Sequence, residues 1–189
     1  ATGIATATGS GKLALSVERS TFERNGSGGD FQGTTTAVIR GSAFAGGATG
    51  LSLGHAGSNQ AVRLELRNCT ISDNAGAAIS ATAASSPSRA IVVSSELSGN
   101  GAGIQVTGPG NLAYASDNTI VRNAIGIAAL SGGVIVSGGD NRVLGNTTDG
   151  TFSSTRNFPP VVNAGADQTV TLPSTAALSG SVTDDGKPS

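Results

Sequence analysis

Residues 64–81 read LELRNCTISDNAGAAISA, and this stretch decides the fold. It consists of short apolar alternations separated by Asn and Gly. Related segments recur along most of the chain when they are aligned on the Asn that follows the second apolar run. The aligned positions, called anchors below, are Asn25, Gly47, Asn74, Asn100, Asn123 and Asn146, which lie 22, 27, 26, 23 and 23 residues apart.

Each repeat contains three short apolar runs. An alternating run lies before the anchor, a large apolar residue stands three positions before it, and a small residue followed by an apolar one comes shortly after most anchors. A fixed period in the low twenties, with runs too short for helices, is typical of a β-solenoid. The pattern therefore predicts an all-β, three-sided parallel β-helix of six to seven coils, in which successive coils pair at roughly 4.8 Å.

The predicted coils cover residues 12–31, 37–53, 61–81, 90–106, 112–129 and 134–152, after a partial coil in residues 3–5. Residues 33–36 are expected to form the loop before the second coil. The connections 54–60, 82–89, 108–111 and 131–133 all fall between a third strand and the next first strand. We therefore expect these loops to lie at one corner of the solenoid.

The anchor Asn residues are expected to form a column at one bend. Asn tolerates the left-handed backbone conformation and bonds nearby backbone groups, and stacked Asn side chains bond along an axis. Gly47 is expected to fill the same bend without a side chain. Tyr114 is aligned with Leu66 and Val136, which predicts a place in the core.

The segments ISDNAGAAI, LSGNGAGI and IVRNAIGI share the pattern apolar-x-x-Asn-x-x-small-apolar. This pattern resembles the right-handed parallel β-helix repeats of the pectate-lyase-like superfamily, over residues 1–152. The resemblance implies the fold but no single activity, because the fold hosts lyases, hydrolases, epimerases, adhesins and inert spacers.

The composition changes after Phe152. Residues 153–160 are expected to be a linker that ends in Pro159 and Pro160. Residues 161–189 resemble the opening strands of an immunoglobulin-like domain of the polycystic-kidney-disease (PKD) type, through VNAGAD at 162–167, residues 168–172, ALSG at 177–180 and DDG at 184–186. Such a sandwich needs about seven strands, so these residues form an incomplete domain. We expect them to pack on the last coil, on the flank of the rod or on a neighbouring molecule.

The charge balance excludes a strongly basic surface. Lys and Arg number 11 against 12 for Asp and Glu, which argues against nucleic acid as a partner. No stretch reaches the length of a membrane span, so membrane insertion is not expected. Cys69 is interpreted as a small buried side chain. The chain begins within a coil, which suggests a piece of a longer polypeptide.

The outward positions of the first strands form the candidate site. Glu18, Arg40 and Arg67 fall in one column on successive coils, and the predicted binding residues are Glu18, Arg40, Arg63, Glu65 and Arg67, with His55 and Arg89 at the rim. In enzymes of the family that the chain resembles, this face often holds the sugar-binding groove. Two interpretations stay open: a polysaccharide-binding face, or a solvated ladder of compensating charges with a solvated loop histidine.

Catalytic, metal and cofactor sites are not predicted. Glu18 and Glu65 lie about two coil spacings apart with Arg40 between them, which suits neither a metal cluster nor a close acid–nucleophile pair. Three functions remain. The first is an extracellular or cell-surface scaffold or carbohydrate-binding module without its own catalytic site. The second is a fragment of a polysaccharide lyase, hydrolase or epimerase, and the third is an adhesin or surface-layer stalk.

Overall fold

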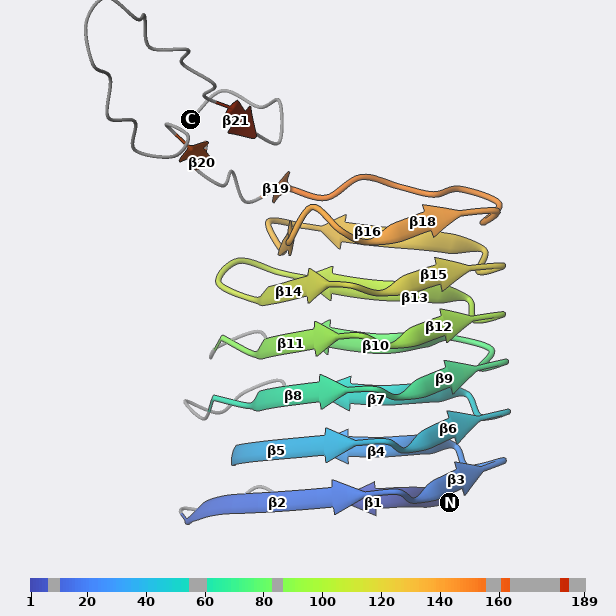
Figure 1. Ribbon diagram of the computed structural model, residues 1–189. Coiled ribbons are helices and arrows are strands. Elements are labelled where there is room, and N and C mark those ends of the chain that lie inside the picture. The colour runs from blue at the N-terminus through green and yellow to red at the C-terminus, as the bar shows by residue number, and fades with distance from the viewer. Residues whose placement is uncertain (7–10, 55–60, 83–86, 156–160, 164–180, 184–189) are drawn as a thin grey trace, which may run out of the picture. The chain divides into compact units, whose positions relative to one another are not determined.

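A computed structural model of the chain describes residues 1–6, 11–54, 61–82, 87–155, 161–163 and 181–183. The chain divides into two compact units, Ala1–Thr155 and Arg156–Ser189. In the first unit the chain winds into stacked coils, and equivalent strands of successive coils pair in parallel (Figure 1). This confirms the predicted all-β, three-sided parallel solenoid.

Three parallel sheets form the sides of the solenoid. Sheet 1 contains β2 (Lys12–Glu18), β5 (Thr34–Arg40), β8 (Arg63–Arg67), β11 (Arg89–Val93), β14 (Leu112–Ser116), β17 (Val134–Ser137) and β19 (Ser154–Thr155). Sheet 2 contains β3 (Thr21–Glu23), β6 (Ala43–Ala45), β9 (Thr70–Ser72), β12 (Glu96–Ser98), β15 (Thr119–Val121) and β18 (Arg142–Leu144). Sheet 3 contains β1 (Thr2–Ala5), β4 (Ser27–Phe31), β7 (Thr49–Leu53), β10 (Ala77–Thr82), β13 (Ala102–Thr107) and β16 (Ile125–Leu130).

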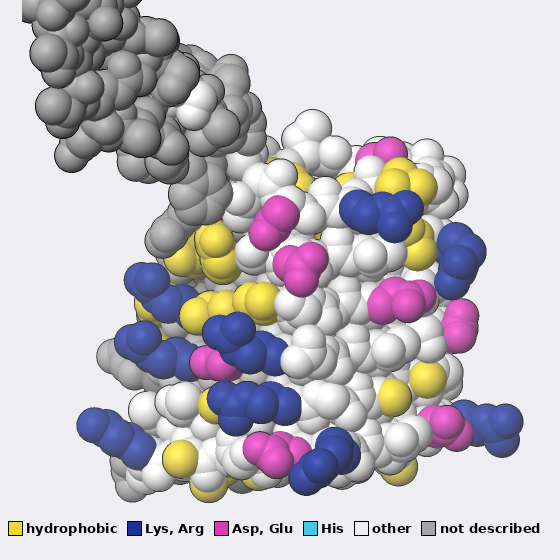
Figure 2. All heavy atoms as spheres, in the orientation of Figure 1, with side chains coloured by type: hydrophobic (Ala, Val, Ile, Leu, Met, Phe, Trp, Pro, Cys, Tyr) yellow, Lys and Arg dark blue, Asp and Glu magenta, His cyan; other side chains and the backbone are white. Residues whose placement is uncertain are grey.

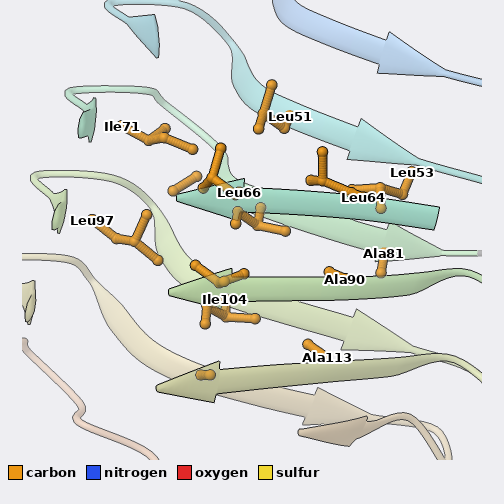
Figure 3. Packing of buried hydrophobic residues seen from close by; sticks show 14 of the residues in the cluster. Leu51, Leu53, Leu64, Leu66, Ile71, Ala81, Ala90, Leu97, Ile104 and Ala113 are labelled. Atoms are coloured by element: carbon orange, nitrogen blue, oxygen red, sulfur yellow. The ribbon is translucent and has the colours of Figure 1, made fainter. Parts of the chain in front are cut away.

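The core is a column of aliphatic side chains that all three sheets supply. Leu66 from sheet 1, Ile71 and Leu97 from sheet 2, and Leu51 and Ile104 from sheet 3 point into the interior (Figure 3). All five are fully buried. Such burial contributes about 1.5–3 kcal/mol for each large side chain, so this column is the main source of stability.

Small residues in sheet 3 make room for the large side chains of sheet 2. A Cβ added at Gly103 would lie 2.5 Å from Cγ2 of Ile120 and 2.6 Å from the carbonyl oxygen of Gly126. A Cβ at Gly50 would likewise lie 2.5 Å from Cγ2 of Ile71. The small residue that follows most anchors is therefore a steric requirement of a narrow interior.

The anchor Asn residues form the predicted column, at the corner between sheets 2 and 3. Asn74 donates its backbone N–H to Oδ1 of Asn100 over 3.1 Å, Asn100 donates to Asn123 over 2.8 Å, and Asn123 donates to Asn146 over 2.9 Å. The carboxylate of Asp149 ends the column, because it accepts from the backbone N–H and from Nδ2 of Asn146. We call this column the Asn ladder.

The left-handed conformation expected of these Asn residues is wrong, whereas their expected hydrogen bonds to nearby backbone are confirmed. The left-handed residue is the one before the anchor, as in Arg24, Asp73 and Arg122, whose φ angles are 54°, 55° and 56°. The Asn is needed for its amide, which bonds the backbone of the preceding coil and the backbone of its own coil, as Asn100 shows. Gly47 keeps the ladder bond, since its N–H donates to Oδ1 of Asn74 over 3.0 Å.

A second ladder runs along the corner between sheets 1 and 2 and was not predicted. At each rung a side chain accepts the backbone N–H of the equivalent residue one coil earlier. The rungs are Ser42, Cys69, Ser95, Asn118 and Asn141, with contacts of 3.1, 3.4, 3.2, 3.0 and 3.1 Å. Cys69 is buried as predicted, and its sulfur is also one of these acceptors.

The predicted core position of Tyr114 is wrong. Tyr114 pairs with Ile91 and Val136, and Ile91 pairs with Glu65, so all four belong to an outward column of sheet 1. Both alternations in this part of sheet 1 are apolar, and in β11 and β14 the smaller set turns inward. The inward residues are Ala90, Val92, Ala113, Ala115 and Ile135.

Pairing extends past two of the predicted boundaries. β5 begins at Thr34, inside the expected loop, because its first residues pair with β2. β19 pairs with β17, so the solenoid continues beyond Phe152 to Thr155. In the second unit β20 (Val161–Asn163) and β21 (Ser181–Thr183) pair antiparallel. The other residues on which the PKD-like resemblance rests, and the expected packing of the tail, lie outside the described residues.

Candidate functional site

The outward face of sheet 1 is built from three columns of side chains. The strand register places Thr36, Arg63, Arg89, Leu112 and Val134 in the first column. The second column contains Val38, Glu65, Ile91, Tyr114 and Val136. The third contains Glu18, Arg40, Arg67, Val93 and Ser116. Every described member of the predicted site therefore lies on this face, as the alternation of strand residues requires.

Four of the predicted site residues form one ion-pair network. Nη1 of Arg40 lies 3.8 Å from Oε1 of Glu18, and Nη2 of Arg40 lies 3.6 Å from Oε1 of Glu65. Nε of Arg67 donates to Oε1 of Glu65 over 2.6 Å. The hydrogen bond from Arg67 lowers the pKa of Glu65; burial opposes this shift, and the charges of Arg67 and Arg40 add to it. Because the side chains are 31–52% exposed, these pairs add little stability.

Arg63 and Arg89 form a separate pair of like charges. They lie directly beside each other on β8 and β11, and both are exposed. In the described part of the chain neither forms an ion pair with a carboxylate. The neighbouring segments 55–60 and 83–86 read HAGSNQ and AASS and contain no Asp or Glu. Two adjacent cations are thus left without a counter-charge from the solenoid sequence around them.

Apolar side chains continue the face toward the C-terminal coils. Ile91 is 41% exposed and Val134 is 37% exposed, and Leu112, Tyr114 and Val136 are half-buried beside them. Figure 2 shows Lys and Arg side chains next to a band of hydrophobic side chains over this sheet. We call Arg63, Arg89, Ile91, Leu112 and Tyr114 the mixed face, because it combines unpaired cations with an aromatic and aliphatic surface.

Sequence reasoning missed Tyr114 as a member of this face. The signal was available, because Tyr114 and Glu65 each lie nine residues before their anchors, Asn123 and Asn74. The strand register pairs both residues with Ile91, which also lies nine positions before its anchor, so counting from the anchors gives the correct column. His55, the other predicted rim residue, lies outside the described residues.

An apolar cavity of about 310 Å³ lies at the C-terminal end of the solenoid. It is lined by Ile125, Ile127, Leu130 and Phe152 together with small neighbours, and none of its lining residues is ionisable. It lies against β16, beyond which sheet 3 has no further strand. This lining offers no acid, base or metal ligand, so the cavity is not a candidate for catalysis.

Within the described ranges no three His, Cys, Asp or Glu side chains gather as metal ligands. The same ranges contain no helix of the length and apolar character needed to cross a membrane.

No curated protein and no solved structure matches the chain. The family model described as "right handed beta helix region" matches residues 2–164. This match spans the whole solenoid, whose three parallel sheets and stacked corner ladders are the features described above. The chain therefore belongs to the right-handed β-helix family.

Proposed function

We propose that the chain is a non-catalytic β-helix scaffold that presents a saccharide-binding surface on sheet 1. The observation on which the proposal depends is the mixed face, where Tyr114 and Ile91 lie beside the exposed Arg89. Sugar rings have an apolar face and a polar rim. Aromatic and aliphatic side chains pack against the former, and arginine donates hydrogen bonds to the latter.

The state of the carboxylates favours binding over hydrolysis on this face. A general acid for glycoside cleavage needs a raised pKa, whereas the hydrogen bond from Arg67 lowers the pKa of Glu65. Arg40 bridges Glu65 to Glu18, so both carboxylates already bind guanidinium groups. Neither is arranged as an acid or a nucleophile.

A second candidate function is a fragment of a polysaccharide lyase or epimerase. The outward position of Tyr114 favours it, because a tyrosine or arginine beside a bound sugar can remove a proton. A structural stalk is the third candidate, and it requires no ligand on any face. For all three we propose an extracellular or cell-surface location, supported by the PKD-like resemblance of residues 161–189.

A glycan array of neutral and acidic polysaccharides tests the proposal. The full chain should retain at least one glycan, and Tyr114→Ala should weaken that binding about tenfold, since stacked aromatic contacts dominate such sites. Ser80→Ala, on the outward face of sheet 3, is the matched control and should leave binding unchanged.

The other two functions give different results in the same experiment. Accumulation of shortened or unsaturated products from a retained glycan would identify an enzyme. If no glycan is retained at all, the chain is a stalk and the proposed saccharide-binding surface does not exist.

A further inference from the structure

We infer that the saccharide taken by the mixed face is acidic, and that Arg63 and Arg89 together bind its carboxylate or sulfate groups. The inference rests on the proposed function and adds the chemical class of the ligand. It comes from a contrast on one sheet. Arg40 and Arg67 on the face of sheet 1 form ion pairs with carboxylates, and Arg63 and Arg89 form none within the described residues.

The contrast is clearest between neighbouring columns. In the third column Arg40 stands between Glu18 and Arg67, and the carboxylates of Glu18 and Glu65 form ion pairs with these two cations. In the first column Arg63 stands beside Arg89, at a strand spacing of about 4.8 Å. Like charges directly opposite each other on a sheet are destabilising. A bound anion would remove that penalty.

The nearest carboxylate does not neutralise this pair. Glu65 follows Arg63 by two residues on β8, but its Oε1 already accepts from Arg67 over 2.6 Å and lies 3.6 Å from Arg40. Two arginines thus share one carboxylate within the ion-pair network. Arg63 and Arg89 therefore keep their donors for a ligand.

Guanidinium groups suit the anions found on saccharides. Each presents a planar fork of N–H donors that matches a carboxylate or sulfate in a two-point hydrogen bond. Ile91 and Tyr114 lie two positions further along β11 and β14 than Arg89 and Leu112, so an apolar surface begins where the cations end. A sugar unit with its acidic group on the arginines would rest its ring on that surface.

The chain contains its own reporter for this test. Tyr114 is the one tyrosine and there is no tryptophan, so intrinsic fluorescence reports on the mixed face. The probes are three polymers with the same neutral backbone: dextran, carboxymethyl dextran and dextran sulfate. The two charged polymers should change the fluorescence saturably, and dextran should bind at least tenfold more weakly. The two charged probes also distinguish a carboxylate site from a sulfate site.

The double variant Arg63→Gln/Arg89→Gln should lower the affinity for the charged polymers at least tenfold and leave thermal unfolding nearly unchanged. The control Arg24→Gln/Arg142→Gln removes the same net charge from exposed positions outside sheet 1, and should change affinity less than threefold. Equal losses in both double variants would mean attraction by overall charge alone, and would overturn the inference.

The outcomes separate this inference from the function on which it rests. If the array shows neutral glycans bound through Tyr114, and Arg63→Gln/Arg89→Gln binds them as tightly as the natural chain, the acidic class is wrong and the saccharide-binding face stands. If neither charged nor neutral saccharides bind, both are wrong.

Discussion

Replacing Asn100 by alanine should destabilise the solenoid more than any other single change in the Asn ladder. The side chain is 3% exposed. Its Oδ1 accepts from the backbone N–H and Nδ2 of Asn74 over 3.1 and 2.8 Å. Its Nδ2 donates to the carbonyl oxygens of Ile71 and Ser98 over 2.9 and 3.1 Å, and to Oδ1 of Asn123 over 3.1 Å.

The magnitude follows from these contacts. Asn100→Ala leaves the buried backbone N–H of Asn74 without an acceptor, which costs about 1–3 kcal/mol. The lost donors of Nδ2 add about 1 kcal/mol for each buried carbonyl that water cannot reach. We therefore expect a loss of about 3–5 kcal/mol in the free energy of unfolding. Asn146→Ala, at the partly exposed last rung, should cost about 1 kcal/mol because water replaces its partners.

Urea denaturation followed by circular dichroism measures both losses. The variant Asn100→Asp adds a test of sign. Its carboxylate would face the carbonyl oxygens of Ile71 and Ser98, so its pKa in the folded chain should be raised above the unfolded value. Stability should then recover as the pH falls below that raised pKa. A loss below about 1 kcal/mol for Asn100→Ala, or one no larger than for Asn146→Ala, would refute the reasoning.

Three further changes test other parts of the structure. Gly103→Ala places a Cβ 2.5 Å from a buried isoleucine side chain and should lower the free energy of unfolding by roughly 2–4 kcal/mol. The control Gly11→Ala has nothing within 4 Å of the added Cβ and should change it by no more than about 0.5 kcal/mol. The same urea titration measures both. The hydrogen bond from Arg67 lowers the pKa of Glu65, so the stability that this carboxylate contributes is present above the ordinary pKa of 4.5 and is lost as the pH falls below it. In a melting series from pH 7 to about pH 3, Glu65→Gln should therefore lose less thermal stability than the natural chain. An identical loss would contradict the contact. Burial raises the pKa of the Cys69 thiol, so a thiol reagent should label it only in denaturant, and Cys69→Ser should cost under about 1 kcal/mol because serines occupy the neighbouring rungs.

The repeat and the Asn ladder could be predicted because they depend on local chemistry. An amide at a fixed position after a buried aliphatic residue, as in residues 71–74, recurs with a period close to one coil. The second ladder has a signal of the same kind that was overlooked. Its residues stand five positions before each anchor, and Ser42, Cys69 and Asn118 are all small polar or sulfur-containing side chains in that place.

The inward phase of the later coils could not be predicted from alternation. In RAIVV, residues 89–93, both faces of the strand are apolar, so the hydrophobic pattern does not choose between them. The choice depends on the volume left by the opposite sheets, where Leu97 and Ile104 fill much of the interior and Ala90 and Val92 fill the rest. That volume is a property of the packed coil.

The candidate site was predictable in part for the same reason. Strand alternation placed the charges of sheet 1 outward, and the column of Glu18, Arg40 and Arg67 was predicted correctly. The cationic pair of Arg63 and Arg89 was not recognised, although both residues stand 11 positions before their anchors, Asn74 and Asn100. The strand pairing shows that these two arginines are neighbours.

The most direct test of the account is nuclear magnetic resonance mapping of the ¹⁵N-labelled chain with carboxymethyl dextran oligomers. The largest amide shifts should fall at Arg63, Arg89 and Tyr114, and amides on the outward face of sheet 3, such as Ser80 and Gln105, should stay unchanged. Shifts centred on sheet 3, or no saturable shift at any amide of sheet 1, would contradict it.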